Sequence, residues 1–415
     1  KLLDGVVVEW KTLGEVAKYI RGLTYSKSNE SADGQGYRVL RANNITLSSN
    51  CLNLNDVKVV KFDTKVKDSQ KLYKDDILIS AASGSREHVG KVAYIESDID
   101  YYFGGFMGVV RCDEKLNPRY LFHVLTSDIF QKYLDEMLNS STINNLNSAV
   151  MGGFKIPIPC PNKPDKSLAI QSEIVRILDK FTALTAELTA ELTMRKKQYN
   201  YYLDQSLSFE EGEVELKTLG EMGTLIRGKR FVKADIIPEG VPCIHYGEMY
   251  TYYSIWADKA KSYISVELAS KLRKASCGDV VFVSAGETIA DIGRGTAWLG
   301  DEDVVIHDAC FFYKSSLNPK YVAYFSRTNF FHDQIKKSIS SGKISAINAK
   351  GFEKVIIPVP SPEEQARIVA FLDKFDTLTS SITEGLPREI ELRHKQYEYY
   401  RDLLFSFPRP ETASN

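Results

Sequence analysis

Residues 171–185 read QSEIVRILDKFTALT, and residues 365–379 read QARIVAFLDKFDTLT, which agrees at 9 of 15 positions. Two further pairs repeat in the same order: EWKTLGEVAKYIRG (9–22) with ELKTLGEMGTLIRG (215–228), and RKKQYNYYLDQSLSF (195–209) with RHKQYEYYRDLLFSF (393–407). The offsets of 194, 206 and 198 residues indicate a tandem duplication of a domain-sized unit and not a solenoid. The repeat predicts pseudo-two-fold symmetry and a partner with two-fold character.

The composition is that of an ordinary globular protein. The chain has 415 residues, 43% of them hydrophobic, and no apolar run of the roughly 18 residues that a membrane span needs. Its six cysteines have no paired spacing, which predicts reduced thiols in a cytoplasmic protein and neither a disulfide framework nor a zinc site. The net charge of −1 lacks the basic excess of a typical DNA-binding domain, so such charge would have to be segregated on one face or supplied by partners.

Each copy has the same order of segments. A long mixed segment contains strand-like apolar runs, such as 77–79 and 280–283, followed by two helical stretches that open with an Asn-Pro pair. It ends in a proline-punctuated strip, which we interpret as an extended linker. These features predict an α+β fold. We divide the chain into an N-terminal segment (1–10), a first globular domain (11–157), a central helix (158–210), a second globular domain (211–358), a C-terminal helix (359–407) and a tail (408–415).

A long amphipathic helix follows each mixed segment. Apolar residues recur in it at spacings of three and four, the pattern of a coiled-coil seam. Gly385-Leu386-Pro387 interrupts the second helix, where Pro387 starts a new helical segment or kinks the old one. A helix with a continuous apolar face is not stable alone in water. We therefore expect the two helices to pair antiparallel, with one globular α/β domain at each end. The seam residues are Ile174, Phe181, Leu184, Leu188 and Leu192 in the first helix and Ile368, Phe375 and Leu378 in the second.

Sequence motifs of enzymes are missing. The stretch GTLIRGKR at 223–230 approaches a phosphate-binding loop, but it ends in Arg230, which has no hydroxyl for Mg²⁺. The Asn-Pro pairs continue with Arg119 and Lys320, so the aromatic motif of DNA amino-methyltransferases is absent. The histidines form no metal-binding motif. We therefore interpret the chain as a non-catalytic binding protein without a metal or cofactor of its own.

The whole chain resembles the specificity (S) subunits of type I restriction–modification enzymes, most closely those of the IC class. The resemblance is strongest at SLAIQSEIVRILDKFTALTAELTAELTMRKKQYNYY (167–202) and SITEGLPREIELRHKQYEYYRDLLFSFPRPE (381–411). It implies that each globular domain is a target-recognition domain, which reads one half of a bipartite double-stranded DNA sequence. The helices would then be the spacer between the halves, with the tandem TAEL repeat at 185–192 as its ruler. Helix-filling residues are the alternative interpretation of that repeat.

The resemblance also implies partners. Two methyltransferase subunits would dock on the helices, and two restriction subunits would complete the nuclease. S-adenosylmethionine, ATP and Mg²⁺ would be bound by these partners and not by this chain, and no membrane is implied. A coiled-coil scaffold that joins other proteins without reading DNA is the alternative function.

Base reading requires polar and basic side chains on loops. Such residues occupy corresponding places in the two copies but differ in type, as expected of two readers of different sequences. In the first domain the candidates are Arg21, Tyr25, Lys27, Arg41, Asn43, Asn44, Ser83, Ser85, Arg86, Thr142, Asn144 and Asn145. In the second they are Arg227, Lys229, Arg230, His245, Tyr246, Glu248, Glu287, Thr288, Ser341, Lys343 and Ser345. An ordinary solvated loop is the alternative for each.

The two helices end in similar basic and aromatic stretches, at 196–202 and 395–400. These residues either pack under the globular domains or hold the methyltransferase subunits.

Overall fold

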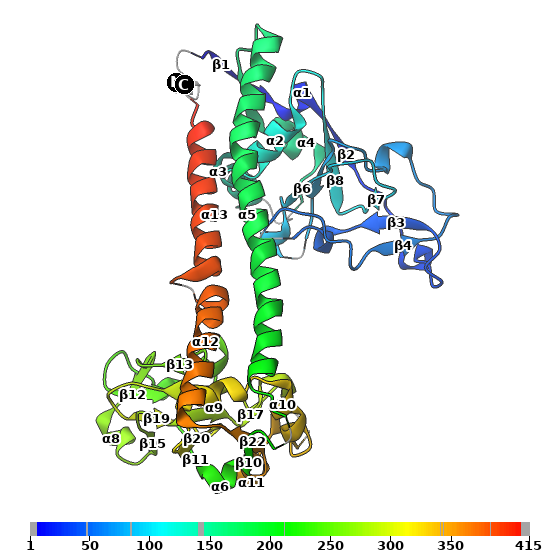
Figure 1. The fold of residues 1–415 in the computed structure, drawn as a ribbon. Coiled ribbons are helices and arrows are strands. Elements are labelled where there is room, and N and C mark those ends of the chain that lie inside the picture. The colour runs from blue at the N-terminus through cyan, green and yellow to red at the C-terminus, as the bar shows by residue number, and fades with distance from the viewer. Residues whose placement is uncertain are drawn as a thin grey trace. The chain divides into compact units, whose positions relative to one another are not determined.

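The computed structural model describes residues 6–46, 49–83, 85–139, 145–210, 212–340, 342, 344–381 and 383–407. The chain forms two compact units (Figure 1). Unit 1 contains the residues up to Glu187 together with those from Ile390 onward, and unit 2 is Leu188–Glu389. Each unit therefore holds one globular domain and stretches of long helix. Within the described ranges, no helix combines the length and the apolar character needed to cross a lipid bilayer.

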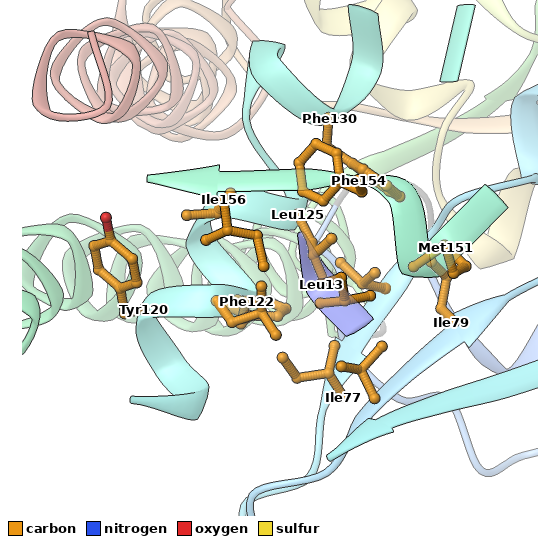
Figure 2. Close-up of a cluster of buried hydrophobic side chains, with 14 of the residues drawn as sticks. Leu13, Ile77, Ile79, Tyr120, Phe122, Leu125, Phe130, Met151, Phe154 and Ile156 are labelled. Carbon is orange, nitrogen blue, oxygen red and sulfur yellow. The ribbon is translucent and has the colours of Figure 1, made fainter. Parts of the chain in front are cut away.

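The domain of unit 1 is built on two sheets, with strand orders β2-β8-β5-β6 and β4-β3-β7. Strand β5 is buried on both faces, which explains its continuous apolar run. Ile77 and Ile79 belong to one hydrophobic cluster (Figure 2), while Leu78 between them belongs to another. The strands are β2 (Ala17–Arg21), β3 (Tyr37–Leu40), β4 (Lys58–Val60), β5 (Ile77–Ser80), β6 (Val92–Tyr94), β7 (Tyr102–Phe103) and β8 (Met107–Cys112).

Among its described residues, four α-helices complete this domain. Helix α2 starts at the predicted Asn-Pro pair, because the side chain of Asn117 accepts hydrogen bonds from two backbone N–H groups and Pro118 occupies the first turn. Their apolar side chains, including Leu125, Phe130 and Met151, pack against the sheet in the cluster of Figure 2. The helices are α1 (Leu13–Val16), α2 (Pro118–Leu125), α3 (Asp128–Asn139) and α4 (Ser148–Gly153).

The proline-punctuated strips are paired strands, which corrects the prediction that they are extended linkers. Each forms a two-stranded antiparallel ribbon with the segment that opens its domain. Proline is tolerated there because every strand of such a ribbon has an open edge. The Tyr120 hydroxyl donates to the carbonyl of Pro157 at 2.7 Å, and the Tyr321 hydroxyl donates to that of Pro358 at 3.0 Å. The ribbon strands are β1 (Val8–Thr12) with β9 (Lys155–Pro159), and β10 (Glu215–Thr218) with β22 (Ile356–Val359).

The domain of unit 2 repeats this plan in a larger form, with sheet orders β11-β20-β16-β18-β13, β14-β12-β19-β15 and β17-β21. Strand β16 takes the place of β5, since Val280 and Phe282 face one cluster while Val281 and Val283 face another. The strands are β11 (Gly223–Arg227), β12 (Val241–Ile244), β13 (Trp256–Ala257), β14 (Ser262–Ile264), β15 (Lys274–Ala275), β16 (Val280–Val283), β17 (Ala285–Gly286), β18 (Gly295–Trp298), β19 (Val304–Ile306), β20 (Cys310–Ser315) and β21 (Ser345–Ala346). The helices are α6 (Leu219–Met222), α7 (Glu248–Thr251), α8 (Val266–Ala269), α9 (Pro319–Phe325), α10 (Asn329–Lys336) and α11 (Ala349–Glu353).

The long helices are α5 (Pro164–Ser206), α12 (Pro362–Ser380) and α13 (Gly385–Leu404). The break predicted at Gly385-Leu386-Pro387 is confirmed. Gly385 has a φ of +78°, which favours glycine, and Pro387 lies in the first turn of α13, where its missing N–H costs no helical hydrogen bond. In unit 1, α5 and α13 run side by side and antiparallel (Figure 1), and the rings of Phe181 and Tyr400 stack at 5.4 Å between centroids.

The helix of each copy ends in the core of the domain of the other copy. Leu203, in the last turn of α5, and Leu207, just after it, belong to the main hydrophobic cluster of unit 2. Phe405 and Phe407, just after α13, belong to that of unit 1. Leu207 and Phe405 occupy the same position of the repeat. Each domain is therefore completed by a segment from the opposite half of the chain.

Candidate nucleic-acid interface

Predicted residues of unit 1 meet around Arg21, at the end of β2. Its guanidinium donates to the side-chain oxygen of Asn145 and to the carbonyl of Leu146, each at 3.0 Å, and to the carbonyl of Gly105 at 3.1 Å. Asn145 also forms a β-bridge with Ala82, which leads into the loop of Ser83, Ser85 and Arg86. The side chain of Arg86 is exposed and forms an ion pair with Asp135 at 2.7 Å. We call Arg21, Ser83, Ser85, Arg86 and Asn145 the first loop cluster.

A second loop cluster of unit 1 consists of Tyr25, Lys27, Arg41 and Asn43. Asp56 organises it, because this carboxylate accepts from Arg41 at 3.0 Å and from Asn43 at 3.1 Å. Tyr25 is half-buried, and burial raises the pKa of its hydroxyl, so it stays a neutral hydrogen-bonding group. Lys27 is exposed. The cluster thus offers two cations and neutral polar groups at the surface.

Three predicted readers are buried, so we no longer assign them contact with a ligand. Asn44 is 1% exposed and ties the loop together by donating to the carbonyls of Asn53 and Asp56. The Glu248 carboxylate accepts from the hydroxyl of Ser262 and from the backbone N–H of His245, which holds the start of α7. Ser345 is buried in β21.

Cationic side chains gather on unit 2 beside β11. The Lys229 ammonium donates to the carbonyl of Lys271 at 2.9 Å, and the Arg273 guanidinium donates to the carbonyl of Arg227 at 2.7 Å. Sequence reasoning did not predict Lys271, Arg273 and Lys274, because they lie more than 40 residues from the predicted loop. Their hydrogen bonds to that loop could not be inferred from the local sequence pattern. The exposed cations of this group, which we call the cationic cluster, are Arg227, Lys229, Arg230, Lys271, Arg273 and Lys274.

An aromatic group adjoins the cationic cluster through Phe231. The His245 ring lies 4.7 Å from the rings of both Tyr246 and His307, and Phe231 packs edge-on against His307 at 5.1 Å. Burial lowers the pKa of His245 and of His307, so both imidazoles are neutral near pH 7. Their Nδ1 atoms accept from the backbone N–H groups of Gly247 and Ala309, so the His245 ring can donate from Nε2. Tyr246 remains partly exposed, which leaves a polar aromatic surface beside the cations.

The remaining predicted readers have simpler placements. Glu287 and Thr288 are exposed directly after β17. Thr142, Asn144, Ser341 and Lys343 lie outside the described residues. Among the described residues, no three or more His, Cys, Asp or Glu side chains are placed to hold a metal ion.

The predicted helical seam divides between core and surface. Ile174 and Ile368 are buried in the domain cores, and the rings of Phe375 and Tyr202 pack together in unit 2. Leu184 departs from the prediction, since it is 37% exposed while the neighbouring Thr185 is buried. The other seam residues, Phe181, Leu188, Leu192 and Leu378, are half-buried.

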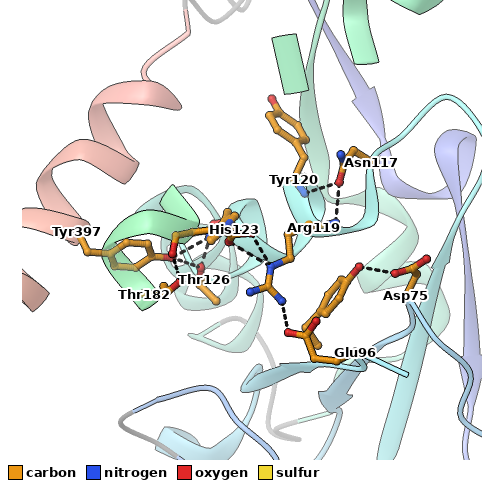
Figure 3. A network of polar contacts seen from close by, with 11 residues as sticks. Asp75, Glu96, Asn117, Arg119, Tyr120, His123, Thr126, Thr182 and Tyr397 are labelled. Atoms are coloured by element: carbon orange, nitrogen blue, oxygen red, sulfur yellow. Dashed lines mark hydrogen bonds and ion pairs between the residues drawn. The ribbon is translucent and has the colours of Figure 1, made fainter. Parts of the chain in front are cut away.

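A polar joint fixes the domain of unit 1 to its helices (Figure 3). Asp179 on α5 accepts from Arg119 at 3.1 Å and pairs with Nε2 of His123 at 2.8 Å, while Nδ1 of His123 pairs with the Tyr397 hydroxyl of α13 at 2.9 Å. Burial lowers the pKa of His123, so a neutral ring donates to Asp179 and accepts from Tyr397. Burial alone would raise the pKa of Asp179, but the hydrogen bond from His123 and the charge of Arg119 outweigh it and lower that pKa.

The corresponding joint of unit 2 uses equivalent positions of the repeat, but these positions hold different residues. Asp373 on α12 accepts from Lys320 at 2.9 Å and from the hydroxyl of Tyr324 at 2.6 Å. Tyr324 thus stands where unit 1 has His123. The helix-end tyrosines divide by role: Tyr199 and Tyr397 are half-buried, whereas Tyr201 and Tyr399 are exposed. The half-buried tyrosines are therefore candidates for packing under the globular domains, and the exposed tyrosines are candidates for binding a partner.

Comparison with known proteins identifies the fold that carries these loops. The profile of the family described as type I restriction modification DNA specificity domain matches twice, at residues 7–194 and 211–392. The specificity subunit of the type I restriction enzyme EcoR124I/EcoR124II from Escherichia coli is 38% identical over 443 residues, covering 100% of this chain and 98% of that protein. The EcoprrI specificity subunit, also from Escherichia coli, is 33% identical and covers 92% of this chain and 91% of its own.

A solved structure agrees on the fold. It comes from work titled as the structural basis of complex assembly and conformational transition of the type I restriction–modification system. It has a TM-score of 0.64 at 16% identity and covers 96% of this chain and 97% of its own. This chain belongs to the type I restriction–modification specificity family, with two copies of the specificity domain.

Proposed function

We propose that this chain is a sequence-specific DNA-binding specificity subunit, in which each unit reads one half of a bipartite, asymmetric double-stranded target. One observation carries the proposal: the two units share the frame of sheets, ribbons and joints, but present different side chains on corresponding loops. The first loop cluster and the cationic cluster both lie beside the end of the strand that opens the domain sheet, β2 or β11. Two domains that share a fold but carry different polar side chains on their loops are expected to recognise different DNA sequences.

Charge supports the same assignment. The total charge of −1 hides the local excess of the cationic cluster, which contains six Lys and Arg side chains around one strand end. Clustered cations neutralise phosphates and position a protein on DNA, while neutral groups such as His245 and Tyr246 can contact base edges. We propose Arg227, Lys229, Arg230, Lys271, Arg273 and Lys274 as phosphate contacts of the second half-site.

The partners follow from the family. We propose that two methyltransferase subunits and, in the nuclease, two restriction subunits assemble with this chain. The chain itself contributes recognition and no catalytic group, and the enzymatic steps belong to those partners. The exposed Tyr201 and Tyr399, at equivalent places on α5 and α13, suit two copies of one partner.

Sequencing of modified adenines tests the proposal. A cell that carries this chain with its methyltransferase partner should modify a bipartite motif with a fixed gap, and sequence-independent or absent modification would refute DNA reading. A protein scaffold without DNA reading predicts no such motif.

The TAEL repeat provides a second test. It lies where the two units divide, at Leu188, so its length affects how far apart the half-sites can be. Deleting residues 189–192 removes about 6 Å of helix. We expect the accepted gap to shorten, or modification to be lost, with each half-site motif unchanged where activity remains. An unchanged gap at full activity would contradict the ruler role.

A further inference from the structure

Phe106 is an exposed aromatic side chain in the turn that contacts both loop clusters of unit 1. It is 71% exposed and lies in the turn that joins β7 to β8. A single exposed apolar side chain is ordinary on a protein surface. The place of this one, between two polar loop clusters, is what distinguishes it.

The turn of Phe106 connects the two loop clusters. On one side, the carbonyl of Gly105 accepts from Arg21 of the first loop cluster at 3.1 Å. On the other side, the backbone N–H of Gly104 donates to the carbonyl of Leu40, the residue before Arg41, and the Tyr25 ring lies beside Gly104. Phe106 therefore stands between the first and second loop clusters.

The backbone of this turn is firmly held. The Met107 N–H donates to the Gly104 carbonyl at 2.8 Å, and the carbonyl of Phe106 accepts from the N–H groups of Ala81 and Ala82 at 2.8 and 3.1 Å. A fixed backbone presents the ring with little loss of entropy when it binds. The backbone that carries the ring is thus preorganised, although the ring itself is exposed.

Unit 2 has the same turn with a different tip. The N–H of Ser284 donates to the carbonyl of Ala309 at 2.9 Å, and Arg227 donates to the carbonyl of Asp308 at 2.8 Å. Ala309 thus replaces Phe106 in a turn that is held by corresponding hydrogen bonds from Ser284 and Arg227. Retention of the turn with a change at its tip is the pattern expected of a specificity position, since the frame needs the turn but not the ring.

We infer that Phe106 is a specificity-determining residue that makes an apolar contact with the bases of the first half-site. This inference rests on the proposed function. A phenyl ring carries no charge or hydrogen-bond donor for a phosphate, so the binding that it adds comes from base surfaces, such as a thymine methyl group or the faces of a base step. Phe106 therefore contributes to discrimination and not to general DNA affinity.

The experiment uses the chain assembled with its methyltransferase partner, with target duplexes taken from the modified motif. We expect Phe106→Ala to weaken binding of the full target by about tenfold or more, the usual scale of one good base contact. Binding to a duplex with a scrambled first half should not change, and neither should the salt dependence. Discrimination of the second half should stay intact. Phe106→Leu should retain part of the affinity.

Phe62→Ala is the matched control, because Phe62 is also exposed, at 64%, but lies after β4, where its ring packs edge-on against Tyr37 at 5.2 Å and takes no part in the Phe106 turn. It should bind as the wild type does. Hydrogen exchange of unit 1 should be the same in the wild type and Phe106→Ala, which would show that the fold is retained. Wild-type affinity of Phe106→Ala, or an equal loss on target and scrambled DNA, would overturn the inference. A wild-type complex that does not distinguish the duplexes would instead overturn the proposed function itself.

Discussion

Replacing Phe405 by alanine should loosen unit 1 and leave unit 2 intact. Phe405 is 1% exposed, and its ring packs edge-on against Tyr120 at 5.4 Å between centroids. Truncating a fully buried phenylalanine removes its transfer free energy and leaves a cavity, a loss of about 3–5 kcal/mol. Because domains are stable by only about 5–15 kcal/mol, this change removes a large part of the stability of unit 1.

Native-state hydrogen exchange with mass spectrometry measures the two units separately. Amides of α2 and β9 report on unit 1, and amides of α9 and β22 report on unit 2. Leu403→Ala is the matched control, because Leu403 is 51% exposed and its loss should change stability by only about 0.5 kcal/mol. Leu207→Ala, at the equivalent position just after α5, should loosen unit 2 by about 2–5 kcal/mol. If Phe405→Ala loosened both units equally, or left the amide protection of unit 1 unchanged, the conclusion that Phe405 stabilises the domain of unit 1 would be refuted.

Two further predictions concern charge. Because burial lowers the pKa of His123, the folded state keeps it neutral while the unfolded state binds a proton, so unit 1 should lose up to about 1.4 kcal/mol per pH unit as the pH falls below about 6.5. His123→Tyr, which copies Tyr324, should remove that dependence in denaturant titrations between pH 7 and 5; an unchanged slope would assign it to another group. Lys229→Gln should lower the slope of log affinity against log salt by about 0.9, as expected for one phosphate contact. Lys336→Gln, an exposed lysine on α10, should leave the slope unchanged, and equal effects of both changes would argue against a localised phosphate site.

The sequence was sufficient where a local pattern determines the structure. The apolar run at 77–79 predicted a strand because both faces of β5 are buried, and Asn117 predicted a helix start because its side chain caps the first turn. Contacts between distant segments could not be predicted in this way. The burial of Phe405 in the domain of unit 1 depends on packing across the chain, and the burial of Asn44 depends on carbonyls that its loop happens to present. Phe106 could not be predicted from the sequence, because base reading is expected of polar side chains and a lone apolar residue in a turn carries no such signal.

The joints explain why the two halves are alike but not interchangeable. Thr126 and Thr182 of unit 1 correspond to Arg327 and Asp376 of unit 2. Burial raises the pKa of Asp376, and the hydrogen bond with Ser380 and the charges of Arg327 and Lys320 partly offset that effect. Replacing Arg327 alone would remove one of the cations that favour the Asp376 carboxylate, and a buried charge that loses such support is costly. Pairs of residues across the joint therefore have to change together, whereas an exposed loop tip such as Phe106 can change alone. The duplicated chain can thus acquire a new half-site through its loops without disturbing the frame that holds them.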